Sequence, residues 1–447
     1  MLNLPSFVLL LFKVISYLTK SMQVQENARK QRNTINLSGI PIIQKLPFSF
    51  ASIGDVAVYE DEATGIRYLS TRDGETKENL KVISLFTGAG GFDIGLEKAG
   101  FENTVCIEID ADCRATLKHN RPKWKIFEDS TGRIAGDIRT ISTEEILEFS
   151  GLRNQEVALI CGGIPCQPFS NIGKKKGSND SMNGDLFLEF VRIVKEIKPK
   201  SFIFENVAGI AQNKHLDVVE YMTKQFSGIG YGLSWKILNA ADYGVGQKRE
   251  RFFLIGILGV DKPAFPLPTH FRDAESWITF ANRLFPTPLY EPEYWVTMGD
   301  VLKSITPDMA QREDCRLMNI SSVVKERMSY ISPGQNFKVL PSSLRPNCWN
   351  TGKHQGHDTF GRGQLDKPAP TIRTAAYNPS KGKYIHPLEN RGFNTIELAS
   401  FQGFPSDWIF KSNGGKVVTL VSAGKQIGNA VPPILAEAIG RAIQVQI

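Results

Sequence analysis

Residues 81–100 read KVISLFTGAGGFDIGLEKAG, and this stretch decides the fold. Its first six residues form an apolar run without alternation, which is typical of a strand buried on both faces of a sheet. A glycine-rich turn follows, and the remaining residues have a helical period that ends at Gly100. A strand, a glycine loop and a helix in this order predict the ligand-binding start of an open α/β sheet.

The same alternation of strands and helices continues along the chain. Four more apolar segments predict strands: TVCIEID (104–110), EVALICGG (156–163), KSFIFENV (200–207) and RFFLIGI (251–257). Two amphipathic segments predict helices: DLFLEFVRIVKEIKP (185–199) and PPILAEAIGRAIQ (432–444). We therefore expect a Rossmann-like α/β fold, in which a parallel sheet carries helices on both faces.

The composition fits a folded protein with a polyanionic partner. The 447 residues are 41% hydrophobic and 22% charged, which allows a sizeable core and two or three domains and excludes disorder. The formal net charge of +7 favours a nucleic acid as the partner. The six cysteines have no zinc-like spacing, so we expect free thiols in a reducing compartment and no metal. The apolar run near the N-terminus stops at Lys13, short of the ~20 residues of a membrane span, so we expect no membrane association.

The glycine loop and the strand ends after it suit a nucleotide cofactor, because glycines let the backbone approach a ligand at a helix N-terminus. Glu108 ends the second strand, where a carboxylate can accept both hydroxyls of a ribose, as NAD and S-adenosylmethionine both require. Asp137 follows Gly136 and suits the exocyclic amine of adenine. The dinucleotide fingerprint needs a glycine where Asp93 stands, which argues against a nicotinamide oxidoreductase.

A thiol follows the third strand. Residues 162–170 read GGIPCQPFS, and Cys166 lies in a segment with no secondary-structure period. Ligands bind beyond the carboxyl ends of the strands in open α/β sheets, so we expect this thiol to face a cleft rather than a core. As a thiolate it is a nucleophile.

A thiolate beside a methyl-donor site indicates one class of reaction. C5 of a pyrimidine is a poor nucleophile, but addition of a thiolate to C6 converts the ring into an enamine whose C5 attacks an electrophilic methyl group. The adduct needs a proton or hydrogen bond at N3 and a cation at O2. Glu205, at the end of the next strand, is placed for N3, and Arg249 and Arg251 are candidates for O2.

Eight motifs resemble those of a known family. In sequence order they are FTGAGG, IEID, GDI, GGIPCQPFS, FENV, QKRERFFLIG, ELASFQGFP and GKQIGNAVPP. Their order and spacing resemble the motif series of DNA (cytosine-5) methyltransferases of the bacterial modification type, from residue 81 to the C-terminus. Two positions depart from the series: Ile164 stands where proline is frequent, and ELASFQGFP lacks its usual arginine.

The resemblance implies S-adenosylmethionine as the cofactor and assigns residues to it. An aromatic residue would stack on the cofactor, the acids at the strand ends would bind its ribose and adenine, and an asparagine would complete the site from the far end of the chain. The implied residues are Phe86, Gly88, Gly90, Gly91, Glu108, Ile109, Asp137, Ile138, Pro165, Leu186 and Asn429.

The resemblance also implies the catalytic groups. Cys166 would be the nucleophile and Glu205 the partner of N3, while Arg249 and Arg251 would hold the cytosine and the cysteine loop. A thiol does not reach a base inside a duplex, so the target cytosine would be flipped out of double-stranded DNA.

Contacts to DNA are implied in two regions. The loop of residues 167–185 would close over the DNA, with Gln167, Ser170, Lys174, Lys175 and Lys176 as its contacts. In the recognition region, Arg362 and Arg373 are candidates for reading guanine in the major groove.

The resemblance divides the chain into three parts. Residues 1–78 form an N-terminal extension of unknown role, and residues 79–305 form the catalytic domain, which residues 415–447 complete. Residues 306–414 form a smaller, mostly β or irregular target-recognition domain. One chain carries every required group, which favours a monomer.

The sequence leaves two alternative functions and one functional partner to consider. Some relatives methylate a transfer-RNA cytosine with the same groups, but we do not find their short Cys-Phe-Thr signature in the recognition region. A catalytically silent DNA-binding homologue is disfavoured by the intact Cys166, Glu205 and arginine pair. A restriction-modification role would bring a cognate endonuclease as a functional partner, in the bacterial cytoplasm at the nucleoid.

Overall fold

The computed structural model describes residues 50–53, 56–61, 63–70, 79–128, 133–164, 184–211, 216–284, 292–350 and 358–447. The opening stretch folds as predicted: β4 (Leu80–Leu85) leads through the glycine loop into α2 (Gly91–Lys98). Gly90 and Gly100 bracket this helix with φ angles of 83° and 90°, a left-handed conformation that glycine adopts without strain.

A six-stranded sheet forms the centre of the fold. Its order is β5-β4-β6-β7-β9-β8. The strands besides β4 are β5 (Phe101–Ile107), β6 (Val157–Gly163), β7 (Ser201–Val207), β8 (Tyr231–Asn239) and β9 (Glu250–Leu258). The predicted strands are confirmed, with one difference in direction: β9 runs antiparallel to both of its neighbours. The sequence pattern did not predict β8, because this edge strand leaves Trp235 and Ile237 exposed.

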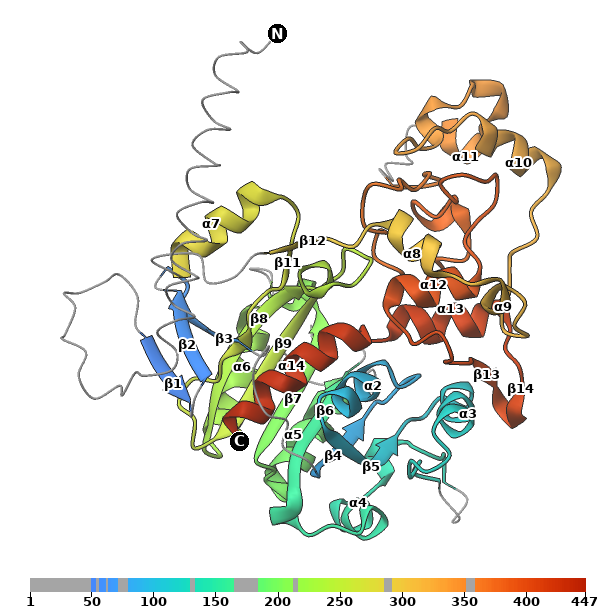
Figure 1. Cartoon of the computed structure of the whole chain (residues 1–447). Helices are drawn as coiled ribbons and strands as arrows, with labels where there is room; N and C mark the ends of the chain where they lie inside the picture. The colour runs from blue at the N-terminus through green and yellow to red at the C-terminus, as the bar shows by residue number, and fades with distance from the viewer. Residues whose placement is uncertain are drawn as a thin grey trace, which may run out of the picture. The chain divides into compact units, whose positions relative to one another are not determined.

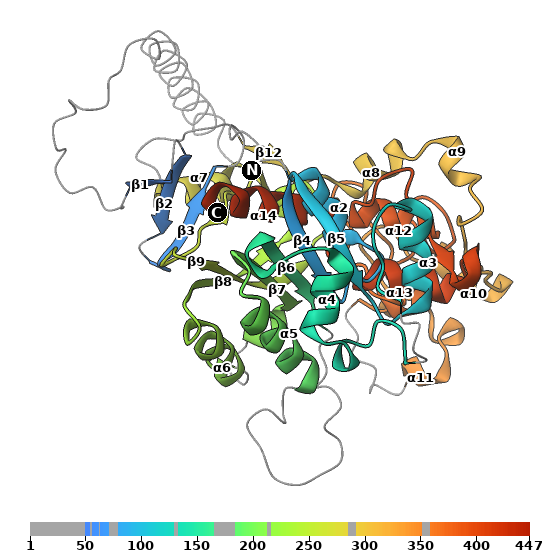
Figure 2. The ribbon, with the colours of Figure 1, turned by 90° about the horizontal axis from the view of Figure 1, so that it is seen from below.

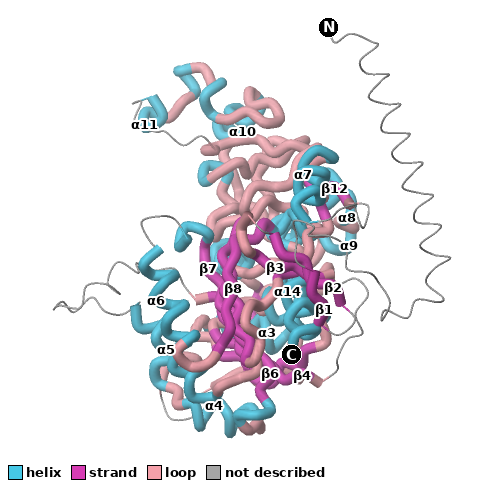
Figure 3. Tube along the Cα trace, turned by 90° about the vertical axis from the view of Figure 1, so that its left-hand side faces the viewer, coloured by secondary structure: helices cyan, strands magenta, loops and turns pink. Residues whose placement is uncertain are grey.

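Helices cover both faces of this sheet, as the unalternating apolar strands predict (Figures 2 and 3). Successive residues of one strand enter opposite cores: Ile203 packs on one face, and Phe202 and Phe204 pack on the other. The helices near the sheet are α2, α3 (Ala111–Asn120), α4 (Thr143–Ser150), α5 (Gly184–Ile197), α6 (Leu216–Ser227) and α14 (Pro433–Gln446). The predicted helices α5 and α14 are thus confirmed.

The last helix, α14, lies against α2, the first helix of the sheet (Figure 1). Glycine makes this approach possible: a Cβ atom on Gly95 would lie 2.3 Å from the carbonyl oxygen of Pro433 and 2.6 Å from the backbone nitrogen of Glu437. On α14, a Cβ atom on Gly440 would lie 2.8 Å from that of Ala99. This packing brings the C-terminal part of the chain to the glycine loop.

Part of the N-terminal extension belongs to a second sheet. Its strands are β1 (Phe50–Ile53), β2 (Val56–Asp61), β3 (Ile66–Leu69) and β10 (Phe265–Pro266), in that order. β3 pairs with β10, and Val58 and Leu69 pack with Ala442 of α14. The amine of Lys236 on β8 donates to the Tyr68 hydroxyl and lies over the Tyr68 ring. The described residues before position 79 therefore pack on the six-stranded sheet through β10, α14 and β8.

Short elements fill the chain between β10 and α14. They are β11 (His270–Phe271), α7 (Ala274–Leu284), β12 (Glu293–Tyr294), α8 (Met298–Ser304), α9 (Pro307–Ala310), α10 (Ser322–Ser329), α11 (Asn347–Asn350), α12 (Thr395–Gln402), β13 (Lys411–Ser412), β14 (Lys416–Val417) and α13 (Leu420–Asn429). In the described part of residues 306–414, named strand structure is confined to β13, and the rest is short helices and irregular backbone. Among the helices described, none has both the length and the apolar character needed to cross a membrane.

We predict that Gly95→Ala lowers the free energy of unfolding by about 1–3 kcal/mol, the usual cost of overpacking. Alanine has the higher helix propensity by about 1 kcal/mol, so the loss would come from the contact between α2 and α14. Gly209→Ala is the matched control, because a Cβ atom there meets nothing within 4 Å. Urea unfolding compares the three proteins, and an unchanged midpoint for Gly95→Ala would contradict the close approach.

Candidate active site

The glycine loop after β4 opens onto free space. Phe86 has a φ of 54° and Gly88 one of 57°. A left-handed conformation is uncommon for a bulky residue and is concentrated at functional sites. A Cβ atom on Gly88 would meet no heavy atom within 4 Å, so the loop offers its backbone to a ligand.

Glu108, at the end of β5, is fixed beside this loop. Its two carboxylate oxygens accept from the backbone N–H groups of Gly88 and Asp110, each at 2.7 Å. Burial raises the pKa of Glu108 above its usual value, against these hydrogen bonds. A carboxylate offers about four lone-pair positions, so both oxygens can still accept the hydroxyls of a ribose.

The GDI motif lies against Glu108 because its first residue is glycine. Gly136 has a φ of 75°, and a Cβ atom on it would lie 2.1 Å from the carbonyl oxygen of Glu108. The Asp137 carboxylate accepts from Arg139 Nε at 2.8 Å and Nη2 at 2.7 Å, and these hydrogen bonds lower its pKa. Arg139 therefore holds Asp137 ionised, and lone pairs are left for an amine donor. Ile138, the next residue, is buried.

Apolar and amide side chains complete the surroundings of the loop. Ile109 is 49% exposed, which is unusual for isoleucine next to a buried strand, and Phe86 and Leu186 are half-buried. Asn429 is exposed at the end of α13, and a Cβ atom on Gly91 would lie 2.4 Å from the carbonyl oxygen of Val431. An open backbone cradle, two acids and an exposed apolar side chain fit the ribose and adenine of S-adenosylmethionine.

Glu205 lies beside the strand that leads to Cys166. In the parallel pairing of β6 and β7, Gly163 is the register partner of Glu205. A Cβ atom on Gly163 would lie 2.9 Å from Glu205 Oε2, so glycine lets the carboxylate approach. Asn206 Nδ2 donates to the carbonyl oxygen of Ile164 at 3.1 Å and fixes the last described residue before Cys166.

Several predicted residues fall outside the described residues. They are Pro165, Cys166, Gln167, Ser170, Lys174, Lys175 and Lys176.

Arg251 pairs with Glu205. Its Nε lies 3.1 Å from Glu205 Oε1. Glu205 is 7% exposed, and burial raises its pKa although Arg251 and Arg249 oppose the rise. The pair thus combines a carboxyl that holds its proton to a higher pH than usual with a fixed cation beside it.

A cavity of about 470 Å³ opens beside Arg251. It is lined by Ala208, Lys248, Glu250, Arg251, Pro370 and Thr371. Two segments far apart in the chain form its wall, because the backbone N–H of Lys248 donates to Ala369 and the Thr371 hydroxyl donates to the Lys248 carbonyl oxygen.

The structure gives Arg249 a different place from the one expected. Its side chain is buried, and its Nη atoms donate to the carbonyl oxygens of Ile372, Gly428 and Ala430 at 2.8, 2.8 and 3.0 Å. Burial and the neighbouring Arg251 lower the pKa of Arg249 to about 9, which leaves it cationic at neutral pH. Since these carbonyls hold both Nη atoms, Arg251 rather than Arg249 is the cation available to a base.

The structure also corrects the expectation for Arg362. This residue is 5% exposed, and its guanidinium donates to the carbonyl oxygens of Met328, Ile331, His386 and Glu389 and to Asn390 Oδ1. It ties the end of α10 to a neighbouring loop and is not free to read guanine. Arg373 is exposed, two residues after the cavity residue Thr371, and stays a candidate.

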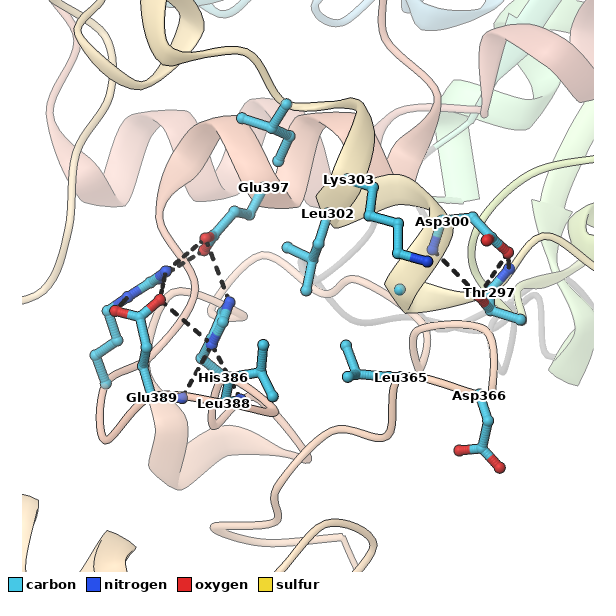
Figure 4. Close-up of a pocket in the computed structure, with 13 residues that line it drawn as sticks. Thr297, Asp300, Leu302, Lys303, Leu365, Asp366, His386, Leu388, Glu389 and Glu397 are labelled. Atoms are coloured by element: carbon cyan, nitrogen blue, oxygen red, sulfur yellow. Dashed lines mark hydrogen bonds and ion pairs between the residues drawn. The ribbon is translucent and has the colours of Figure 1, made fainter.

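A second cavity, of about 560 Å³, lies between α8 and the loops around His386 (Figure 4). His386 Nδ1 accepts from the backbone N–H groups of Leu388 and Glu389, and burial lowers the pKa of this histidine. Arg391 donates to both oxygens of Glu397, at 2.7 and 2.8 Å. Arg391 therefore supplies a cation to the ELASFQGFP segment, in which the sequence shows none.

Three buried polar residues that the sequence reasoning missed support the site. Asn206 holds the carbonyl oxygen of Ile164, two residues before Cys166. Gln247 Oε1 accepts from the backbone N–H of Ile372 at 2.9 Å, and Gln402 Nε2 donates to the carbonyl oxygen of Ala430 at 2.5 Å. The signal was available, because each is an amide inside a quoted motif: FENV, QKRER or ELASFQGFP.

The fold and this site define an S-adenosylmethionine-dependent methyltransferase. The chain belongs to the family of C-5 cytosine-specific DNA methylases, whose model matches residues 80–445. It is accordingly a DNA (cytosine-5) methyltransferase that uses S-adenosylmethionine, as the motif series implies.

Curated relatives agree with this family. The chain is 35% identical over 375 residues to the Type II methyltransferase M.PspPI of Psychrobacter sp., covering 83% of this chain and 80% of that protein. It is 32% identical over 371 residues to the Type II methyltransferase M1.HphI of Haemophilus parahaemolyticus, covering 82% and 87%.

Solved structures share the fold. A structure described as a prophage-encoded DNA modification methyltransferase of E. coli is 25% identical, with a TM-score of 0.57 over 81% of this chain and 98% of that one. The structure of Spodoptera frugiperda DNMT2 has a TM-score of 0.52 at 14% identity, over 81% and 99% of the chains, and shares the fold alone.

We predict that the stability of Glu205→Gln relative to the wild type increases from pH 4 to pH 8. The folded-state pKa of Glu205 is raised, so its contribution to stability is present at low pH and is lost as the pH rises through that pKa. Glutamine does not titrate, keeps the shape and avoids the cost of burying a charge.

Urea unfolding at several pH values measures this trend. Glu145→Gln is the control with the opposite pH trend. Arg133 lowers the pKa of Glu145 to about 2, so this variant should lose more of the free energy of unfolding as the pH rises. A Glu205→Gln difference that is constant between pH 4 and 8 would contradict the raised pKa.

Proposed function

We propose that this enzyme methylates C5 of a cytosine flipped out of a specific double-stranded DNA site, through a covalent bond from Cys166 to C6. The supporting observation is the register of β6 and β7. It sets the Glu205 carboxylate against Gly163, three residues before Cys166, with Arg251 paired to it.

In this proposal each protein group has one task in the reaction. The Cys166 thiolate forms a bond to C6, and the developing charge is met by a proton from Glu205 at N3 and by Arg251 at O2. S-adenosylmethionine supplies an electrophilic methyl group. After C5 takes the methyl group, the C5 proton passes to solvent water, the thiolate leaves C6, and the N3 proton returns to the Glu205 carboxylate, which restores the aromatic ring. The raised pKa of Glu205 suits the donation of that proton.

For the cofactor, we propose that the predicted set of residues binds it as the loop geometry suggests. Gly88 and its neighbours would leave room for the ligand, Glu108 would hold the ribose, and Asp137 would accept from the adenine amine. Ile109 and Phe86 would flank the adenosine, and Asn429 would close the site.

For the DNA, we propose that the cavity beside Arg251 receives the flipped nucleotide. Its volume of about 470 Å³ is ample for a base, and Lys248 at its wall suits a phosphate. Residues 306–414 would form the target-recognition domain, with Arg373 a candidate for base contact, and residues 79–305 with 415–447 would form the catalytic domain.

The relatives point to a biological setting. M.PspPI and M1.HphI are named Type II methyltransferases, so we propose that this chain is the modification enzyme of a restriction-modification system. A cognate endonuclease would then be its functional partner, and it would act as a monomer in the bacterial cytoplasm, at the nucleoid.

We predict that the purified full chain transfers labelled methyl groups from S-adenosylmethionine to double-stranded DNA. Bisulfite sequencing of DNA from cells that express it should show methylated cytosines within one sequence context. Transfer RNA of the same host is the matched alternative substrate, and transfer to this RNA alone would overturn the DNA assignment.

We predict that Cys166→Ala abolishes the covalent complex with DNA that carries 5-fluorocytosine at the target. Fluorine at C5 is not lost as a cation, so the wild-type enzyme stays attached to C6 and shifts in a denaturing gel. Cys161→Ala is the control, because Cys161 is buried in β6 and should leave the complex intact. A complex that survives Cys166→Ala would move the nucleophile elsewhere.

A further inference from the structure

Arg249 is the centre of a buried polar network that joins three segments. The first is its own QKRER segment, which also carries Arg251. The others are the segment around Ile372, next to Thr371 in the cavity wall, and the end of α13, which carries Asn429. Arg249, Gln247 and Gln402 are each at most 1% exposed, so the network is shielded from water.

The segment around Ile372, which we place on the DNA side, is held through the backbone N–H and the carbonyl oxygen of Ile372. The backbone N–H of Ile372 donates to Gln247 Oε1 at 2.9 Å, and its carbonyl oxygen accepts from Arg249 Nη1 at 2.8 Å. Thr371 and Arg373 flank Ile372 in the chain. Thr371 lines the cavity and Arg373 is exposed, so the bonds to Ile372 fix the backbone that carries both side chains.

The cofactor side is held on both sides of Asn429. Arg249 Nη2 donates to the carbonyl oxygens of Gly428 and Ala430, and Gln402 Nε2 donates to the latter as well. Gln402 also accepts from Gln247 Nε2, which closes the network. The peptide units on either side of Asn429 are therefore fixed by the same guanidinium that fixes Ile372.

Glycines bring the two segments into direct contact. A Cβ atom on Gly428 would lie 2.4 Å from the carbonyl carbon of Arg373, and one on Gly424 would lie 2.5 Å from the carbonyl oxygen of Thr374. The backbone on the DNA side and the last turns of α13 thus pack as one layer, with Arg249 as its common donor.

We propose that Arg249 is a positioning residue that couples the cofactor site to the DNA-facing segment, and that it makes no contact with the cytosine. This rests on the proposed function, because Asn429 and the cavity beside Arg251 are its two ends. One planar guanidinium serves three carbonyl groups, which an ammonium group does not match. With this donor in place, ordering either end orders the other, so each ligand strengthens the binding of its counterpart.

The test measures how S-adenosylhomocysteine and DNA affect each other's binding. The DNA is an unmodified duplex that carries the methylation site found by bisulfite sequencing. Calorimetry measures the affinity for S-adenosylhomocysteine with and without DNA, in the wild type, Arg249→Lys and Arg251→Lys. Lysine keeps the charge and reaches fewer carbonyls, so we expect Arg249→Lys to bind S-adenosylhomocysteine at least tenfold more weakly without DNA. The strengthening by DNA should fall towards a factor of one.

Arg251→Lys is the matched control from the same segment. Arg251 pairs with Glu205 and lines the cavity, so its replacement should lower kcat and leave the affinity for S-adenosylhomocysteine without DNA within twofold of wild type. The proposal would be overturned if Arg249→Lys lowers kcat in the same way but keeps the wild-type affinity for S-adenosylhomocysteine and its strengthening by DNA. Arg249 would then be assigned to contact with the cytosine.

A second variant covers the case in which Arg249→Lys does not fold. Gln402→Met keeps the volume and removes the bonds to Ala430 and Gln247, and it should reduce the coupling with DNA at least threefold. Unchanged coupling in Gln402→Met would count against the network. Wild-type protein that binds no S-adenosylhomocysteine would instead refute the proposed function, so the two failures are distinguishable.

Discussion

Parallel pairing of β5, β4, β6 and β7 is the constraint on which the site depends, because it brings the carboxyl ends of these strands to one edge. Phe86, Glu108, Ile164 and Glu205 follow or end these four strands and therefore meet there. Parallel strands need cover on both faces, and the two apolar cores on either side of the sheet provide it. The chemistry is thus positioned by the same burial that stabilises the fold.

Close backbone approach is the second requirement, and glycine meets it at each point where the site is assembled. Gly163 admits the Glu205 carboxylate, Gly136 admits the GDI segment to Glu108, and Gly95 admits α14 to α2. These contacts join residues that are between 28 and 338 positions apart in the chain. The glycines of the motifs therefore serve packing between segments as much as the binding of a nucleotide.

Buried arginines hold the outer part of the chain in place. Arg249 and Arg362 both donate to several carbonyl oxygens in the last turns of helices and in irregular backbone, where no helix or strand partner is left to satisfy them. Removal of such a donor would leave buried carbonyls without partners, which costs more than the loss of a surface contact. The sequence analysis assigned both arginines to contacts with nucleic acid. The sequence around an arginine does not show whether its guanidinium binds a nucleic acid or several backbone carbonyl oxygens.

The sequence by itself determined five of the six strands of the central sheet, the helices α2, α5 and α14, the order of the motifs and the acids at the strand ends, because local apolar period and turn residues record these directly. It did not determine the reversed direction of β9, the packing of β1–β3 on α14 and β8, or which member of the Arg249 and Arg251 pair faces the cavity. Those depend on contacts between residues far apart in the chain, where burial and hydrogen-bond partners are set by the neighbours that folding supplies. The tertiary structure therefore decided which charged side chains are free to act and which hold the backbone together.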